Sequence, residues 1–241
     1  MTRVRADLLL VARGLAESRA KARAAIEAGG VRADGVLVTK PSDLIAEAAV
    51  LEVTPAHPWV SRGGVKLAHA LDVFGVDANG RICLDVGAST GGFTHVLLSR
   101  GAARIYAVDV GQGQLHASLR NDARVASLEK TDARHLTAAL MPAPPSLIVC
   151  DVSFIGAAKA LAMPLSLGTA EADLIVLIKP QFEAGPHKNA VLDEGAARDA
   201  AQNAIDGLDG VDGFHFVAAI DSPIRGSDGN LERLAHFRRR P

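Results

Sequence analysis

The stretch Ile82-Cys83-Leu84-Asp85-Val86-Gly87-Ala88-Ser89-Thr90-Gly91-Gly92-Phe93 decides the fold. It begins with an apolar run that contains one acid, continues with glycines and small residues, and regains a helical apolar pattern at Phe93. This order predicts a buried strand, a tight turn and a helix that begins near Thr90. The glycines let a ligand approach the backbone, and the positive end of the helix dipole points to the same place. In an open α/β sheet, such a corner binds a cofactor.

The spacing of the glycines separates the cofactor classes. A dinucleotide-binding loop has the pattern G-x-G-x-x-G and a phosphate-binding loop ends in Lys-Ser/Thr, whereas the glycines here run G-x-x-x-G-G. A second predicted strand, Arg104 to Val108, leads into Asp109, where a carboxylate can accept both hydroxyls of a ribose. Together these features resemble the S-adenosylmethionine-binding half of the Rossmann-like methyltransferases. The alternative is a glycine-rich turn that only connects a strand to a helix.

Composition indicates a globular protein with two domains. The chain has 241 residues, of which 49% are hydrophobic and 22% charged, enough for one α/β domain and a smaller one. It shows neither a membrane-spanning apolar run nor a signal-peptide pattern, so we expect a cytoplasmic protein without a membrane partner. Cys83 and Cys150 lie in apolar runs and are expected to be buried, reduced thiols. No metal is expected, because ligand-like pairing is missing among His57, His69, His95, His116, His135, His187, His215 and His236.

Positive charge is concentrated at the start of the chain. Residues 1–40 hold eight Lys or Arg against four acids, which is the electrostatic pattern of nucleic-acid binding, a solvated helix face being the alternative. A first helix is predicted, with one apolar face made of Leu8, Leu9, Val11 and Ala12. A second helix is predicted over Arg19 to Ala28, ended by Gly29-Gly30. An Asp34-Gly35 turn then predicts a hairpin over Val31 to Val38.

This segment resembles the S-four RNA-binding module, named after a ribosomal protein. The resemblance covers Arg3 to Lys40-Pro41 and implies binding to structured RNA through phosphate and shape. A linker rich in proline follows, so we expect an RNA-binding domain over residues 1–60 and a second domain over 61–241. The expected RNA-binding residues are Arg3, Arg5, Arg13, Ser18, Arg19, Lys21, Arg23 and Arg32.

Strand and helix patterns alternate through the second domain. After a helix that carries Lys66 and Leu67, strands are predicted to end at Asp151 and at Lys179, and a late strand over His215 to Ile220 precedes a polar return to Glu232. The carboxyl ends of parallel strands meet at one edge, beside the cofactor loop. We therefore expect Asp151, Lys179 and Glu232 to meet there.

Lys66, Asp151, Lys179 and Glu232, in that order, resemble the Lys-Asp-Lys-Glu tetrad of the FtsJ-like ribose 2′-O-methyltransferases. The fusion to an S-four module, with Ser-Arg-Gly-Gly before Lys66, resembles the TlyA, or hemolysin A, family. The resemblance implies a Rossmann-like methyltransferase that moves a methyl group from S-adenosylmethionine to the 2′-hydroxyl of a cytidine in ribosomal RNA. It assigns the tetrad to catalysis, Asp109 to the ribose and Asp132 to the adenine amino group. The remaining expected cofactor residues are Gly87, Ala88, Ser89, Gly91, Gly92, Phe93 and Asp151.

The tetrad residue types suit this reaction. A ribose hydroxyl is a weak nucleophile at neutral pH, so the enzyme must orient it and accept its proton. A lysine at a strand end can act as the base or as the orienting group, with the two acids fixing its direction. The rival interpretations are a catalytically idle RNA-binding protein, a nicotinamide oxidoreductase, which the glycine spacing disfavours, and a cytolysin, for which the sequence offers no membrane span.

Overall fold

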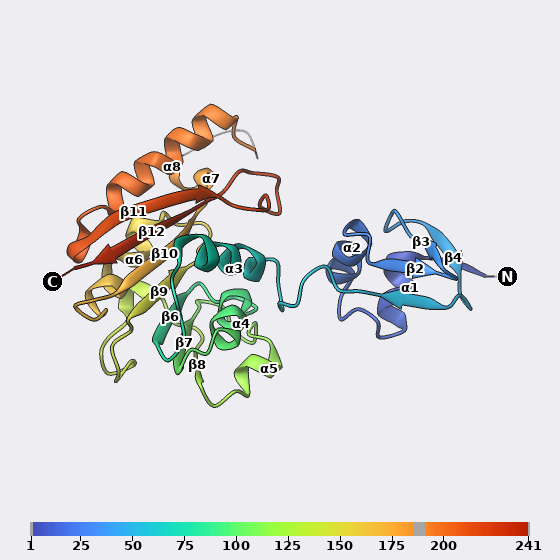
Figure 1. The fold of residues 1–241 in the computed structure, drawn as a ribbon, viewed down its shortest axis with the longest axis horizontal. Helices are drawn as coiled ribbons and strands as arrows, with labels where there is room; N and C mark the ends of the chain where they lie inside the picture. Colours follow the sequence, from blue (N-terminus) through green and yellow to red (C-terminus); the bar gives the residue numbers. More distant parts are fainter. Residues whose placement is uncertain (1, 186–190, 241) are drawn as a thin grey trace. The chain divides into compact units, whose positions relative to one another are not determined.

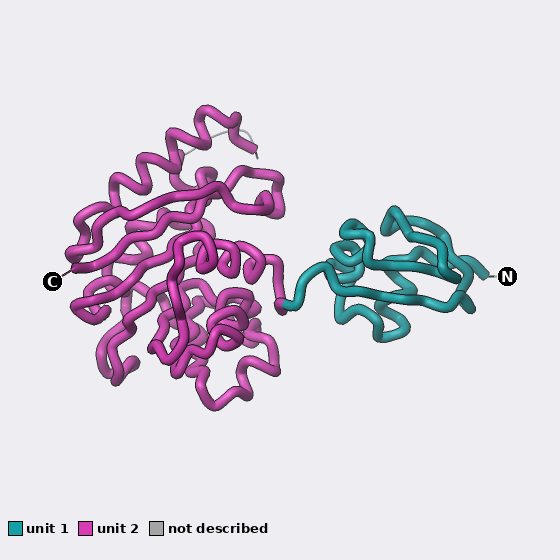
Figure 2. The backbone as a smooth tube through the Cα atoms, in the orientation of Figure 1, with its two compact units in different colours: residues 1–58 teal, residues 59–241 magenta. Residues whose placement is uncertain are grey.

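The computed structural model describes residues 2–185 and 191–240. Two compact units, Met1–Pro58 and Trp59–Pro241, divide the chain (Figure 2). His187, one of the histidines considered above, lies outside the described residues.

The first unit is a small α+β unit. A two-stranded antiparallel sheet pairs β1 with β4, and a three-stranded antiparallel sheet has the order β3-β2-β5. The two helices pack together over a core that includes Leu10, Ala22 and Ile26. The elements are β1 (Arg3–Arg5), α1 (Ala6–Ala12), α2 (Arg19–Glu27), β2 (Val31–Ala33), β3 (Val36–Leu37), β4 (Leu44–Ala46) and β5 (Leu51–Val53).

Local sequence signals explain most of these boundaries. The Ser18 side chain caps α2 by accepting a hydrogen bond from the Lys21 backbone N–H, and Gly29, at φ +72°, follows the helix end. Asp34 and Gly35 both have positive φ, as a two-residue hairpin turn requires. One expectation is wrong: Leu8 is exposed, and the buried residues of α1 are Ala6, Asp7, Leu9 and Leu10.

The second unit is built on a seven-stranded sheet with the order β11-β12-β10-β9-β6-β7-β8 (Figure 1). The five strands from β10 to β8 are parallel, whereas β12 runs antiparallel to both of its neighbours. The strands are β6 (Ile82–Val86), β7 (Arg104–Val108), β8 (Val125–Leu128), β9 (Leu147–Cys150), β10 (Asp173–Ile178), β11 (Phe214–Asp221) and β12 (Arg233–Arg239).

Helices cover both faces of this sheet. One core cluster joins the strands to α6 and α8, and a second joins them to α3, α4 and α5. The expected Rossmann-like α/β architecture is therefore confirmed. The helices are α3 (Gly63–Phe74), α4 (Gly92–Ser99), α5 (Ala117–Arg120), α6 (Ala157–Ser166), α7 (Pro180–Glu183) and α8 (Glu194–Leu208), with 3₁₀ turns η1 (Ala133–His135) and η2 (Val211–Gly213).

The sequence did not predict β12. Its sequence, Arg-Leu-Ala-His-Phe-Arg-Arg, has arginines at both ends and a histidine inside, which is not the pattern of a core strand. In the structure, however, the four residues from Leu234 to Phe237 are all buried. His236 is tolerated in the core because its Nε2 lies 2.8 Å from Oδ1 of Asp173 on the neighbouring strand β10. The two cysteines are buried and unpaired, as expected, and burial raises the pKa of the Cys83 thiol to about 12.

Candidate active site

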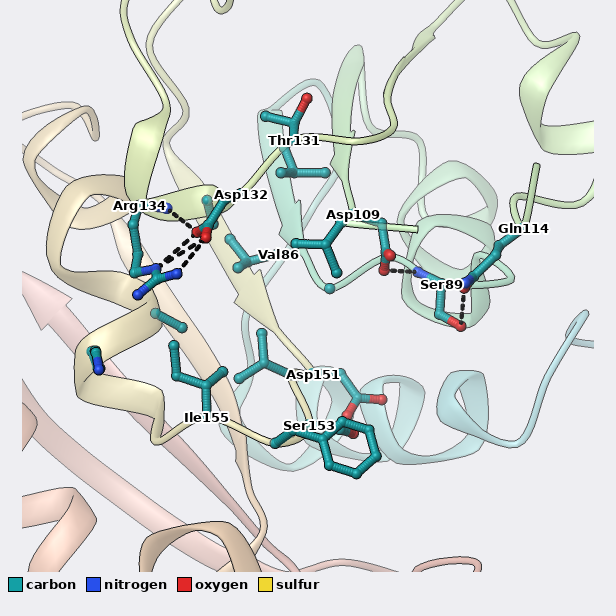
Figure 3. A pocket seen from close by; sticks show the side chains of 18 residues that line it. Val86, Ser89, Asp109, Gln114, Thr131, Asp132, Arg134, Asp151, Ser153 and Ile155 are labelled. Carbon is teal, nitrogen blue, oxygen red and sulfur yellow. Dashed lines mark hydrogen bonds and ion pairs between the residues drawn. The ribbon is translucent and has the colours of Figure 1, made fainter. Parts of the chain in front are cut away.

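A cavity of about 620 Å³ opens at the carboxyl ends of β6, β7 and β9 (Figure 3). The residues that directly follow these strands, Gly87, Asp109 and Asp151, all line it. Parallel strands thus gather the expected residues at one edge, as the topology requires. Ser89 and Asp132, two further expected cofactor residues, also line the cavity.

Backbone geometry at the glycine-rich turn shapes the cavity floor. Gly87 has φ +81°, and a Cβ atom there would lie 2.7 Å from the Asp151 carbonyl oxygen, so only glycine fits without displacement. Ser89, two residues after Gly87, has φ +47° and donates its backbone N–H to Oδ2 of Asp109 at 2.8 Å (Figure 3). Oδ1 of Asp109 accepts from the Gly111 backbone N–H at 2.7 Å. The carboxylate therefore ties the ends of β6 and β7 together.

Four expected cofactor residues do not line this cavity. Ala88 and Phe93 are buried. Gly91 has φ +95°, and a Cβ atom there would meet the side chains of Leu115 and Leu119. A Cβ at Gly92 would lie 2.2 Å from Oγ of Ser61, so α4 packs closely against the residues before α3. The close contacts at Gly91 and Gly92 require glycine at both positions, and direct contact of any of the four residues with a cofactor stays a prediction.

An ion pair forms part of the cavity wall on the η1 side. Asp132 accepts from the Arg134 guanidinium, with Oδ2 2.5 Å from Nη2 (Figure 3). Hydrogen bonds from Arg134 lower the pKa of Asp132 to about 2. Asp132 is thus a carboxylate at neutral pH, which can accept hydrogen bonds from a ligand amino group.

A buried acid, Asp85, lies in the middle of the strand that leads into the turn. Its side chain is fully buried, and Oδ2 accepts from the Thr94 hydroxyl at 2.6 Å. Desolvation raises the pKa of Asp85 to about 7. No functional role was predicted for this residue, although an acid inside an apolar run is itself a signal of an unusual environment.

The four tetrad residues form two ion pairs. Nζ of Lys179 lies 2.6 Å from Oδ1 of Asp151 and donates to Oγ of Ser153 at 2.8 Å. Lys66, on α3, forms a buried ion pair with Glu232. The start of α3 approaches the first pair, because a Cβ atom at Gly63 would lie 3.5 Å from Oδ2 of Asp151. All four residues therefore lie at the cavity edge of the sheet.

Glu232 reaches this edge for a reason that the sequence did not suggest. It does not follow the carboxyl end of a parallel strand; it directly precedes β12, which is antiparallel to β10. The first residue of β12, Arg233, pairs with Ile178, the last residue of β10. The start of an antiparallel strand and the end of its parallel-running neighbour share one edge, so Glu232 and Lys179 lie at the same end of the sheet.

Phe154 also belongs to the cavity, although no feature of the sequence predicted a role for it. It lines the cavity, is 90% exposed and has φ +68°, a conformation that bulky residues rarely adopt. Its ring centroid lies 5.1 Å from that of Phe182. An exposed aromatic ring held in a strained backbone conformation marks a candidate binding surface. No local pattern in the sequence distinguishes it from a core phenylalanine.

The expected RNA-binding cations of the first unit are mostly held by protein groups. Arg5 and Arg19 both bind the buried Asp7. The Arg13 guanidinium donates to the carbonyls of Glu47 and Ala49. The remaining expected residues form local contacts or are exposed: Lys21 with Glu17, Arg23 with Glu27, Arg32 with the Gly35 carbonyl, Ser18 as the helix cap, and Arg3 on the surface.

Within residues 2–185 and 191–240, no group of three or more His, Cys, Asp or Glu side chains is placed to hold a metal ion. None of the helices in the described part of the chain is long and apolar enough to span a membrane.

The fold and the cavity edge define a Rossmann-like methyltransferase. The FtsJ-like methyltransferase family model matches residues 59–239, and the S4 domain model matches residues 4–51. The chain belongs to the FtsJ-like methyltransferases and, among them, to the TlyA, or hemolysin A, family. The expected enzyme class and its cofactor, S-adenosylmethionine, are thereby confirmed.

Named relatives support this assignment over almost the whole chain. The 16S/23S rRNA (cytidine-2′-O)-methyltransferase TlyA of Mycobacterium tuberculosis is 45% identical, over 98% of this chain and 90% of its own length. Hemolysin A of Brachyspira hyodysenteriae is 40% identical, over 97% and 99%. A solved structure of a Streptococcus thermophilus protein, provisionally described as a hemolysin, has a TM-score of 0.76 at 36% identity and covers 100% of this chain and 90% of its own.

Proposed function

We propose that this protein transfers the methyl group of S-adenosylmethionine to the 2′-hydroxyl of a cytidine in ribosomal RNA. The observation that carries the proposal is the Lys179–Asp151 ion pair, with 2.6 Å between Nζ and Oδ1, at the edge of the cavity. The related protein from M. tuberculosis bears the name of this reaction. Ribosomal RNA as the substrate implies action in the cytoplasm.

The cavity residues suit S-adenosylmethionine. A Cβ atom at Gly87 would meet the Asp151 carbonyl, so glycine lets the turn after β6 pack closely against the residues after β9, and both segments line the cavity. Asp109 would take the ribose hydroxyls and Asp132 the adenine amino group, because carboxylates accept hydrogen bonds from both. When bound, S-adenosylmethionine supplies a methyl group on a sulfonium, which an in-line nucleophile can displace.

Lys179 is the residue we assign to the acceptor hydroxyl. Asp151 and Ser153 fix the direction of its amine, so the amine can hold the hydroxyl oxygen in line. The proton that the hydroxyl loses passes to this lysine–carboxylate pair. The Lys66–Glu232 pair is buried and holds α3 against the start of β12.

Phe154 is the residue we assign to the target base. Base–aromatic stacking is largely independent of sequence, and a ring that is 90% exposed beside the cavity can offer one face to a base. The S4 unit would supply phosphate contacts that position structured RNA without reading bases.

Mapping of ribose methylation tests the proposal. Ribosomal RNA from cells that lack the gene is compared with RNA from cells that carry the wild type or Lys179→Ala. We expect 2′-O-methylation of a cytidine only with the wild type. Identical maps in all three strains, together with tight RNA binding by the purified protein, would favour the idle RNA-binding alternative.

A further inference from the structure

In the S4 unit, a buried carboxylate lies below two exposed arginines. Asp7, in the first turn of α1, has no exposed surface, whereas the side chains of Arg5 and Arg19 are 43% and 59% exposed. Arg5 comes from the end of β1 and Arg19 from the first residue of α2. Three separate elements therefore converge on one carboxylate.

The contacts define the direction of both guanidinium groups. Nε and Nη2 of Arg5 donate to Oδ1 and Oδ2 of Asp7, each at 3.0 Å, and Nη2 of Arg19 donates to Oδ2 at 3.0 Å. A guanidinium has five N–H donors, so both arginines keep donors for a ligand. The backbone of Asp7 is itself held, because its N–H donates to the Pro41 carbonyl at 3.1 Å.

We propose that Asp7 is a positioning residue for RNA recognition: it holds Arg5 and Arg19 side by side as a paired clamp for the phosphate backbone. This rests on the proposed function only in taking structured RNA as the ligand. Both guanidiniums are positively charged and bind the same carboxylate, so they would repel each other without it. When Asp7 holds both arginines, their side chains are already ordered before RNA binds. The entropy cost of ordering them then no longer opposes RNA binding.

The proposal reverses the result expected from charge alone. Asp7→Asn keeps the shape of the side chain and raises the net charge by one, so a purely electrostatic surface would bind RNA more tightly. If Asp7 positions the clamp, Asp7→Asn instead weakens binding by about tenfold. Glu27→Gln is the matched control, because Glu27 is an exposed acid of the same unit, paired with Arg23 at 3.7 Å, and its substitution changes the charge equally.

The experiment measures binding of the full-length protein to transcribed 16S and 23S ribosomal RNA over a range of salt concentrations. We expect Glu27→Gln to bind as tightly as the wild type or slightly more tightly, and Asp7→Asn to bind about tenfold less tightly at moderate salt. Equal or tighter binding by Asp7→Asn would overturn the proposal.

A double-mutant cycle separates positioning from folding. Because Arg5 and Arg19 are exposed, their replacement by lysine keeps the charge and leaves the core intact, but removes the planar fork. Asp7→Asn should have little further effect on RNA affinity in the Arg5→Lys, Arg19→Lys background. A full additional tenfold loss there would show that Asp7 acts only through the stability of the unit. Wild-type protein that binds RNA but does not methylate it would refute the proposed function and leave this test intact.

Discussion

Nζ of Lys179 lies 2.6 Å from Oδ1 of Asp151, although the two residues follow different strands and α6 lies between them in the sequence. The parallel pairing of β9 with β10 brings the two residues together. Cys150 pairs with Val176, and both strands end at the same edge of the sheet. The cavity that Asp151 lines is bounded by the turn after β6, so the ion pair and the cofactor loop share one side of the sheet.

Substitution of Lys179 should separate chemistry from cofactor binding. We expect Lys179→Ala to lower single-turnover methyl transfer to ribosomal RNA by about 10²-fold or more, because the group that orients or deprotonates the hydroxyl is lost. Lys179→Arg should fail as well, since a guanidinium keeps its proton and has a different shape. Calorimetric titration with S-adenosylmethionine should give nearly wild-type affinity for both variants. Wild-type turnover by Lys179→Ala would refute the assignment.

The Lys66–Glu232 pair allows stability and activity to be measured apart. Glu232→Gln leaves a buried ammonium without its partner and should cost about 3–5 kcal/mol of unfolding free energy. The double variant Lys66→Met, Glu232→Gln should regain most of that stability while methyl transfer stays low. Recovery of activity together with stability would mean that the pair only supports the fold.

The buried Asp85 predicts a pH-dependent stability. The pKa of Asp85 is about 7 in the folded protein, against 3.8 for a free aspartate side chain. The folded state therefore binds the proton more tightly than the unfolded state. The contribution of Asp85 is therefore complete below about pH 4 and is lost as pH rises to about 7, a change of roughly 4 kcal/mol. In Asp85→Asn, the free energy of unfolding, measured with urea, should depend less on pH across this window.

Asp122→Asn is the control for this pH profile. Asp122 is bound by Arg124, which lowers the pKa of its carboxyl to about 2, so its contribution is lost only as pH falls below about 4. Unfolding of the second unit can be followed through Trp59, the single tryptophan of the chain. A wild-type stability that does not change between pH 4.5 and 7.5 relative to Asp85→Asn would contradict the assignment.

Two glycines with similar backbone angles distinguish strain from a steric clash. Gly87 has φ +81° and Gly113 has φ +67°, but an added Cβ meets the Asp151 carbonyl only at Gly87. Gly113→Ala should cost about 1–2 kcal/mol from conformation alone. Gly87→Ala should cost more and should also weaken cofactor binding in a titration. Equal losses at the two positions would show that the close approach at Gly87 is not needed.

Phe154 should affect RNA turnover without affecting the cofactor. We expect Phe154→Ala to lower single-turnover methyl transfer at subsaturating RNA by about tenfold, the loss of one base–aromatic stack. Phe216→Ala is the control, because Phe216 is also partly exposed but lies on β11 at the sheet edge. Equal effects of the two substitutions would argue against a base-stacking role for Phe154.

Periodic and glycine-rich segments were predictable from sequence, and residues placed by long-range pairing were not. The bounds of the strand Arg104–Val108 were predicted to the residue, because an apolar run bounded by turns encodes a buried parallel strand. The polar residues of β12 are not typical of a core strand. His236 can be buried there because it contacts Asp173 of β10, and this contact cannot be read from the local sequence. Phe154 could not be assigned because its exposure and positive φ exist only in the folded chain.

The order of β12 in the sheet has a consequence for biosynthesis. This strand follows every other strand of the sheet in sequence, yet it lies between β10 and β11. While the chain is being synthesised, Lys66 has no Glu232 to pair with until the segment that holds Glu232 and β12 has left the ribosome. The tetrad can therefore be assembled only after the other six strands of the sheet have been synthesised, and a chain truncated after β11 would hold the glycine-rich turn without a complete site.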